Sequence, residues 1–219
     1  MTNRLVVFDC DGTLVDSQHS ICAAMTRAFE EAKLTPPDRP AILSVVGLSL
    51  PHAMARLLPE AASDFHDHLA ERYKLAFQTL RRAEGVQEPL YPGIADLIVA
   101  LDEAGWLLGV ATGKSDRGLR LCLTHHGVHD RFVTLQTADR HPSKPHPSML
   151  LTAMAQAGAE PETTVMIGDT SFDIDMARAA GVRAIGVGWG YHPPAELIAA
   201  GARAVAMDSA ELRAHIDAA

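Results

Sequence analysis

Short, largely apolar segments recur along this chain and alternate with longer segments of helical periodicity. Each apolar segment is rich in branched side chains and ends at polar turn residues, which is typical of strands buried on both faces of a sheet. Because the helical segments supply the crossovers that parallel strands need, the alternation predicts a parallel α/β sheet flanked by helices. The predicted strands lie at residues 5–8, 107–111, 132–135, 164–167, 182–187 and 202–206.

One connection is much longer than the others. About a hundred residues separate the strand at 5–8 from the strand at 107–111, whereas a crossover needs about a dozen or somewhat more. Apolar residues at helical spacing within this stretch indicate that it is all-helical. We therefore predict a helical domain at residues 16–86, inserted into an α/β core domain that residues 1–15 and 87–219 form.

Net charge and cysteine content exclude several classes of protein. A formal net charge of -8 argues against a nucleic-acid partner, because phosphate backbones are bound by clustered Lys and Arg. Three cysteines without paired spacing suggest neither a zinc site nor disulfides and favour a reducing cytoplasm. The apolar run at residues 5–8 is too short for a signal peptide or a membrane span, so we expect no membrane partner.

Two acidic residues follow the first predicted strand. Asp9 and Asp11 lie two positions apart, and Gly12 permits the sharp turn that brings both carboxylates over one site. A divalent cation would offset the cost of two neighbouring acids, and oxygen ligands favour Mg²⁺. Read alone, the pattern is more often that of a solvated Asx turn.

Groups suited to a phosphoryl group come later in the chain. The Thr112 hydroxyl and the Gly113 amide directly follow the strand at 107–111, where both can donate to a phosphoryl oxygen. An ordinary strand-to-helix turn is the alternative. Lys144 stands in a proline-stiffened loop, where its charge can neutralise a phosphoryl group, although most loop lysines are simply solvated.

A second acidic pair follows the strand at 164–167. Asp169 comes directly after the strand end and is the predicted metal ligand. Asp173 lies near the start of a helix and either holds a metal-bound water or orients Lys144. Thr170 or Ser171 is suited to cap that helix.

The order of these pieces resembles the haloacid dehalogenase-like hydrolase superfamily. Its four motifs match Asp9-x-Asp11-Gly12-Thr13, Thr112, Lys144 and Gly168-Asp169-x-x-x-Asp173. The resemblance covers the whole chain and implies a Rossmann-like core with a helical cap inserted after the first strand. Within the superfamily, the chain looks most like the phosphoglycolate phosphatase group, although Cys10 and Phe172 stand where those enzymes more often have leucine and asparagine. Segments 14–17, 91–93, 144–147 and 189–191 carry this narrower resemblance.

The resemblance implies a Mg²⁺-dependent phosphatase acting on a small phosphorylated metabolite such as 2-phosphoglycolate. Asp9 is then the nucleophile that forms an aspartyl-phosphate, and Asp11 is the general acid and base. The resemblance also assigns the remaining roles: Mg²⁺ to Asp9, Asp169 and the backbone carbonyl of Asp11, and charge stabilisation to Lys144, Thr112 and Gly113.

Related functions stay open at this point. A phosphomutase uses the same residues but returns the phosphoryl group to a second hydroxyl of a sugar. A pyrophosphatase is also possible, because the motifs do not distinguish one transferable phosphoryl group from another. A dehalogenase fits less well, because a halide leaving group does not need the acid that Asp11 supplies. A receiver-like signalling module needs neither that acid nor a helical cap. The substrate, the cap residues that set specificity and the oligomeric state, monomer or homodimer, are not fixed by the sequence.

Overall fold

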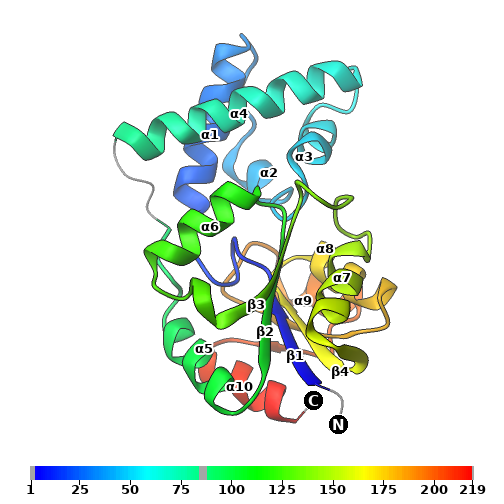
Figure 1. Cartoon of the computed structure of the whole chain (residues 1–219). Helices are drawn as coiled ribbons and strands as arrows, with labels where there is room; N and C mark the ends of the chain where they lie inside the picture. The colour runs from blue at the N-terminus through cyan, green and yellow to red at the C-terminus, as the bar shows by residue number, and fades with distance from the viewer. Residues whose placement is uncertain (1–2, 84–87, 219) are drawn as a thin grey trace.

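The computed structural model describes residues 3–83 and 88–218 (Figure 1). At its centre is a six-stranded sheet of order β3-β2-β1-β4-β5-β6, in which all neighbouring strands are parallel. The predicted α/β fold is therefore confirmed. The strands are β1 (Asn3–Phe8), β2 (Leu107–Thr112), β3 (Phe132–Thr137), β4 (Ala159–Gly168), β5 (Arg183–Val187) and β6 (Ala204–Ala206).

Strand β1 shows why the apolar segments form this sheet. Leu5, Val6, Val7 and Phe8 are all fully buried. Val6 and Phe8 belong to one hydrophobic cluster, and Leu5 and Val7 belong to another. Because successive side chains point to opposite faces and helices cover both, every position of the strand has to be apolar.

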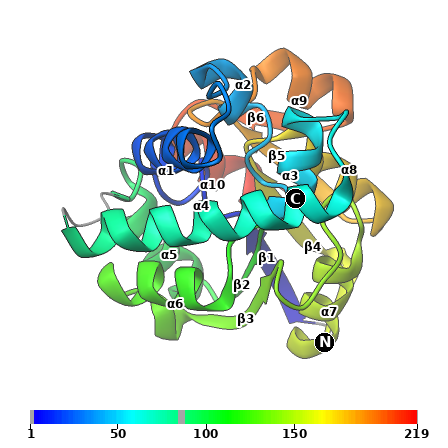
Figure 2. The same cartoon turned by 90° about the horizontal axis from the view of Figure 1, so that it is seen from above.

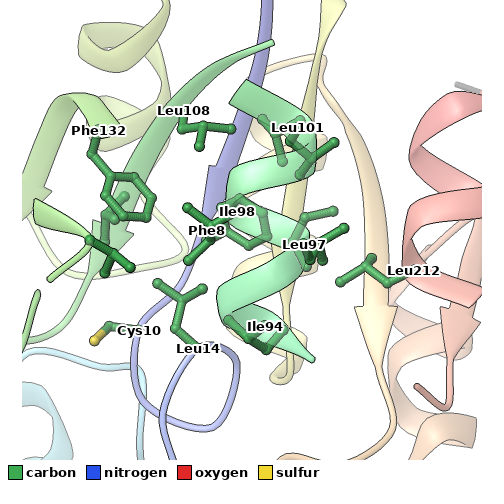
Figure 3. Packing of buried hydrophobic residues seen from close by; sticks show 14 of the residues in the cluster. Phe8, Cys10, Leu14, Ile94, Leu97, Ile98, Leu101, Leu108, Phe132 and Leu212 are labelled. Carbon is green, nitrogen blue, oxygen red and sulfur yellow. The ribbon is translucent and has the colours of Figure 1, made fainter. Parts of the chain in front are cut away.

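Helices cover both faces of the sheet. One face carries α5 (Ile94–Glu103), α6 (Asp116–His125) and α10 (Ser209–Asp217), with a short 3-10 helix at His129–Arg131. The other carries α7 (Ser148–Ala157), α8 (Ser171–Ala179) and α9 (Pro194–Ala200). Figure 3 shows how α5 packs on the first face, with Ile98 beside Phe8 and Leu97 near Leu212 of α10.

Four helices that the structure describes between β1 and α5 form a layer over the carboxyl edge of the sheet (Figure 1), and Figure 2 shows α4 crossing this edge. It consists of α1 (Gln18–Glu31), α2 (Arg39–Leu43), α3 (Leu50–Leu57) and α4 (Ser63–Ala83). These helices share their own buried cluster, so the predicted helical insertion is confirmed. Sequence periodicity does not reveal α2 and α3, since both are too short to show a repeating apolar face.

The predicted boundaries of the helical domain, at residues 16 and 86, stay a prediction. Its second boundary, between residues 86 and 87, lies outside the described residues. From here on, the helical layer of α1 to α4 is called the insertion.

A matched pair of leucines tests the packing of the core. Leu101 in α5 is fully buried, whereas Leu151 in α7 is 49% exposed. We expect Leu101→Ala to lower the free energy of unfolding by about 2–5 kcal/mol, because it removes packed methyl groups and leaves a cavity. Leu151→Ala should change it by no more than about 0.5 kcal/mol. Urea denaturation followed by circular dichroism measures both, and equal losses would contradict the assigned core.

Candidate active site

The topology of the sheet brings two predicted acids together. Strands β1 and β4 are neighbours, and the later strands continue outward from them on opposite sides. Open α/β sheets bind ligands at such a switch point, outside the carboxyl ends of the strands. Asp9 directly follows β1, and Asp169 directly follows β4. Their carboxylates therefore meet at the place where this fold usually binds its ligand.

Three carboxylates form a buried cluster at the switch point. Oxygen atoms of Asp9, Asp169 and Asp173 lie within 4.8 Å of one another, and all three side chains are fully buried. The Asp169 oxygens accept hydrogen bonds from Thr13 Oγ1 at 2.7 Å and from the Tyr191 amide at 3.0 Å. By contrast, Asp9 Oδ2 is buried without a hydrogen-bond partner among the described residues. Such an atom is expensive to bury unless a ligand contacts it.

The electrostatics of this cluster fit a divalent cation. Burial raises the pKa of Asp9 to about 7, an effect that Lys144 opposes and that Asp173 and Asp11 strengthen. Burial and then the charges of Asp173 and Asp9 raise the pKa of Asp169 well above its usual value. A bound cation would favour the ionised carboxylates and supply the missing partner of Asp9 Oδ2. Oxygen-only ligands are those of a hard cation.

Lys144 is held inside the same cluster. Its Nζ lies 2.6 Å from Asp173 Oδ1 and 3.0 Å from Asp9 Oδ1, and the residue is 1% exposed. Burial lowers the pKa of Lys144, but the charges of Asp173 and Asp9 outweigh this and leave it above its usual value. The lysine is therefore a fixed positive charge beside Asp9, and a solvated loop position is wrong for it.

Asp173 has two structural duties. Its Oδ2 accepts hydrogen bonds from the Thr170 amide at 3.0 Å and from Thr170 Oγ1 at 2.7 Å. The Asp173 amide in turn donates to Thr170 Oγ1 at 3.4 Å, which completes a capping box at the start of α8. Its Oδ1 accepts from Lys144. Since protein donors already occupy both oxygens, these contacts favour orientation of Lys144 over the holding of a metal-bound water.

Thr112 and Gly113 lie beside the insertion. Thr112 ends β2, is 1% exposed, and its Oγ1 accepts a hydrogen bond from the Lys114 amide at 3.2 Å. A Cβ atom on Gly113 would lie 2.6 Å from the carbonyl oxygen of Leu48 and 2.9 Å from that of Gly47. The missing side chain thus lets the insertion pack on this turn, a reason that the sequence does not reveal. The expected phosphate contacts of Thr112 and Gly113 stay a prediction.

Asp11 belongs to a second network of charges. Asp11 Oδ1 accepts hydrogen bonds from Ser17 Oγ and from Lys114 Nζ, the latter at 2.6 Å. The same Nζ lies 2.7 Å from Glu88 Oε1, and Glu88 Oε2 lies 2.9 Å from Arg81 of α4. This buried chain of charges joins the predicted acid to the insertion. Its members are far apart in sequence, and nothing in the local pattern pairs Lys114 with Glu88.

Other contacts hold the insertion down over the site. The Ser49 amide donates to Ser143 Oγ at 2.9 Å, and the guanidinium of Arg56 lies 5.1 Å from the ring centroid of Phe172. Beneath the insertion, Asp9 is fully buried. In this arrangement solvent does not reach the Asp9 side chain.

Glu88 provides a test of the link between insertion and core. The Glu88 side chain is 6% exposed, and Glu88→Ala removes this partner from the partly exposed Arg81 and from Lys114, which keeps its contact with Asp11. We expect a loss of about 1.5–3 kcal/mol in the free energy of unfolding, because hydrogen bonds between charged groups are lost at a largely buried position. Glu71→Ala is the matched control, since Glu71 pairs with Lys74 on the surface and such a pair contributes about 1 kcal/mol at most. Thermal or urea unfolding measures both, and losses of similar size would refute the proposed link.

Known proteins resemble this chain over most of its length. "Probable phosphatase IndB" from Dickeya dadantii is 39% identical over 201 residues, which cover 90% of this chain and 86% of that protein. A phosphoglycolate phosphatase from Pseudomonas putida is 31% identical over 86% of this chain and 71% of its own. A crystal structure of a hydrolase from Pseudomonas syringae superimposes with a TM-score of 0.87 at 26% identity and covers 100% of this chain and 99% of its own.

A family model agrees with these similarities. The model described as haloacid dehalogenase-like hydrolase matches residues 6–187. That range contains both acidic pairs, the turn at Thr112 and the loop that presents Lys144. The chain belongs to the haloacid dehalogenase-like hydrolase family.

Proposed function

We propose that this protein is a Mg²⁺-dependent phosphatase that hydrolyses a small phosphate monoester through an aspartyl-phosphate on Asp9. The observation that carries the proposal is the setting of Asp9, a buried carboxylate at the switch point with Lys144 on one oxygen and no hydrogen-bond partner, among the described residues, on the other. A covalent phosphoenzyme needs such an oriented carboxylate. Relatives named as phosphatases support the same reaction class.

The first half of the reaction forms the intermediate. Asp9 attacks phosphorus in line, and the bond between phosphorus and the leaving oxygen breaks as the new bond forms. Asp11 donates a proton to the leaving alkoxide. Lys144 balances negative charge beside Asp9, while Thr112 and Gly113 donate hydrogen bonds to the transferring group.

The second half releases phosphate. A water molecule attacks phosphorus of the aspartyl-phosphate and gives its proton to Asp11, which restores the Asp9 carboxylate and frees inorganic phosphate. Asp9, Asp169 and the backbone carbonyl of Asp11 would hold Mg²⁺. When bound, the ion reduces the repulsion between the anionic nucleophile and the anionic substrate.

The partners of the protein and its location in the cell stay predictions. Among the described residues, no helix combines the length and the apolar character that crossing a membrane requires. The expected partner is a small phosphorylated metabolite, with 2-phosphoglycolate as the narrower hypothesis. A cytoplasmic location and the lack of a nucleic-acid partner are further predictions.

Substitution of the two acids after β1 tests their roles. We expect Asp9→Asn to abolish phosphate release, because an amide cannot form the acyl phosphate. Asp11→Asn should slow turnover by about 100-fold or more, the scale of general acid-base catalysis. Asp175→Asn in α8 is the control, since Asp175 pairs with Arg178 and lies outside the carboxylate cluster. Release of inorganic phosphate from monoesters is the measurement. Wild-type turnover by folded Asp9→Asn protein would sink the mechanism.

Metal removal tests the cation site. We expect chelation to remove activity and added Mg²⁺ to restore it, because the clustered carboxylates then lose and regain their counter-charge. Asp169→Asn should raise the Mg²⁺ concentration needed for half-maximal activity by about tenfold or more, as loss of a well-placed ligand group does. Full activity in the chelated protein would contradict a metal-dependent reaction.

A further inference from the structure

A cavity of about 360 Å³ lies between the insertion and the core. Asp11, Gly113 and Lys114 line it from the core. Asp11, the proposed general acid, borders this space, so a leaving group that Asp11 protonates can extend into it. Pockets that hold drug-sized ligands have volumes of roughly 300–1,000 Å³. The space is therefore much larger than a two-carbon leaving group needs.

The wall that the insertion contributes is mostly apolar, with Lys74, Gln78, Arg81 and Arg82 of α4 as its charged and amide-bearing members. Ile21 and Met25 of α1 and Tyr73 and Phe77 of α4 line the cavity. The ring centroids of Tyr73 and Phe77 lie 5.9 Å apart. All four residues also pack in the hydrophobic cluster of the insertion, which fixes their positions. Such a wall stabilises an apolar ligand surface and disfavours a buried carboxylate.

The charges beside the cavity are already paired or exposed. Lys114 lies 2.7 Å from Glu88, and Arg81 lies 2.9 Å from the other oxygen of Glu88. Two further arginines that line the cavity, Arg82 and Arg117, are exposed to solvent. An ion pair formed there with a ligand carboxylate contributes little. The lining thus favours apolar contact over recognition of a second anionic group.

We propose that the preferred substrate is a phosphate monoester whose alcohol carries an aromatic or similarly ring-sized apolar group. The ring packs against α1 and α4 while the phosphoryl group lies at Asp9, so the proposal rests on the proposed phosphatase function. It departs from 2-phosphoglycolate as the preferred substrate. 2-Phosphoglycolate fits the catalytic residues, but it leaves most of the cavity unfilled and places a carboxylate against the apolar wall.

A comparison of three monoesters distinguishes the effect of the size of the leaving group from the effect of its charge. Phenethyl phosphate carries a ring, ethyl phosphate lacks it, and 2-phosphoglycolate replaces it with a carboxylate. The first two have alcohols of similar acidity, so a difference in kcat/KM between them reports contacts in the cavity. We expect kcat/KM for phenethyl phosphate to exceed both others by about tenfold or more, since a single added methylene in a hydrophobic pocket already contributes about tenfold.

Substitution of two phenylalanines in α4 tests whether the ring of the substrate packs against Phe77. Phe77→Ala should lower the ratio of kcat/KM for phenethyl phosphate to that for ethyl phosphate by about tenfold, because the ring loses its contact surface. Lys114 Nζ lies 5.7 Å from the Phe77 ring centroid, but a disturbance passed through Lys114 to Asp11 slows both esters alike and leaves the ratio unchanged. Phe65→Ala makes the same substitution on the same helix outside the cavity, and it should leave the ratio at the wild-type value.

Binding of matched phosphonates keeps the inference testable without turnover. Calorimetry with phenylpropylphosphonate and propylphosphonate should show at least about tenfold tighter binding of the first. Turnover with 2-phosphoglycolate or ethyl phosphate equal to or above phenethyl phosphate overturns the inference and leaves the phosphatase function standing. No turnover of any ester, with the binding preference present, overturns the phosphatase function and supports the cavity assignment. No turnover and equal binding overturn both.

Discussion

The buried ion pairs of Lys144 with Asp173 and Asp9 are the interaction on which the rest of the site depends. Three charged groups taken out of water are costly unless their geometry is closely fixed. Here each comes from a different segment: the end of β1, a proline-flanked loop and the first turn of α8. The charges keep their places because the sheet and its helices hold all three segments rigidly.

Strand order then decides which chemistry these charges can serve. Because β1 lies beside β4, the carboxylate of Asp169 at the end of β4 lies at the same edge as Asp9, and the insertion covers that edge. Water is largely excluded, so each charge near Asp9 acts in a medium of low polarity and is felt strongly. The same cover supplies an apolar wall beside the acid Asp11. In the proposed reaction the core binds the phosphoryl group, and the insertion contacts the group attached to it.

Much of this could be predicted from the sequence, and the rest could not for identifiable reasons. The strands and the residues at their ends were predictable because burial on two faces imposes continuous apolar runs, and a strand ends where polar residues begin. The link from Lys114 through Glu88 to Arg81 was not, since a surface lysine and a buried one look alike in sequence. Gly113 was singled out for phosphate approach, whereas the structure shows that the carbonyl of Leu48 occupies the space its side chain would need.

The capping box at α8 has a consequence for how mutations at this site are interpreted. Asp173 both starts a helix of the core and anchors the ammonium group of Lys144. The start of α8 and the position of the Lys144 ammonium group therefore depend on one side chain, and a substitution there removes the helix cap and the anchor of that charge together. Any selection for activity at this position acts at the same time on how well the helix begins.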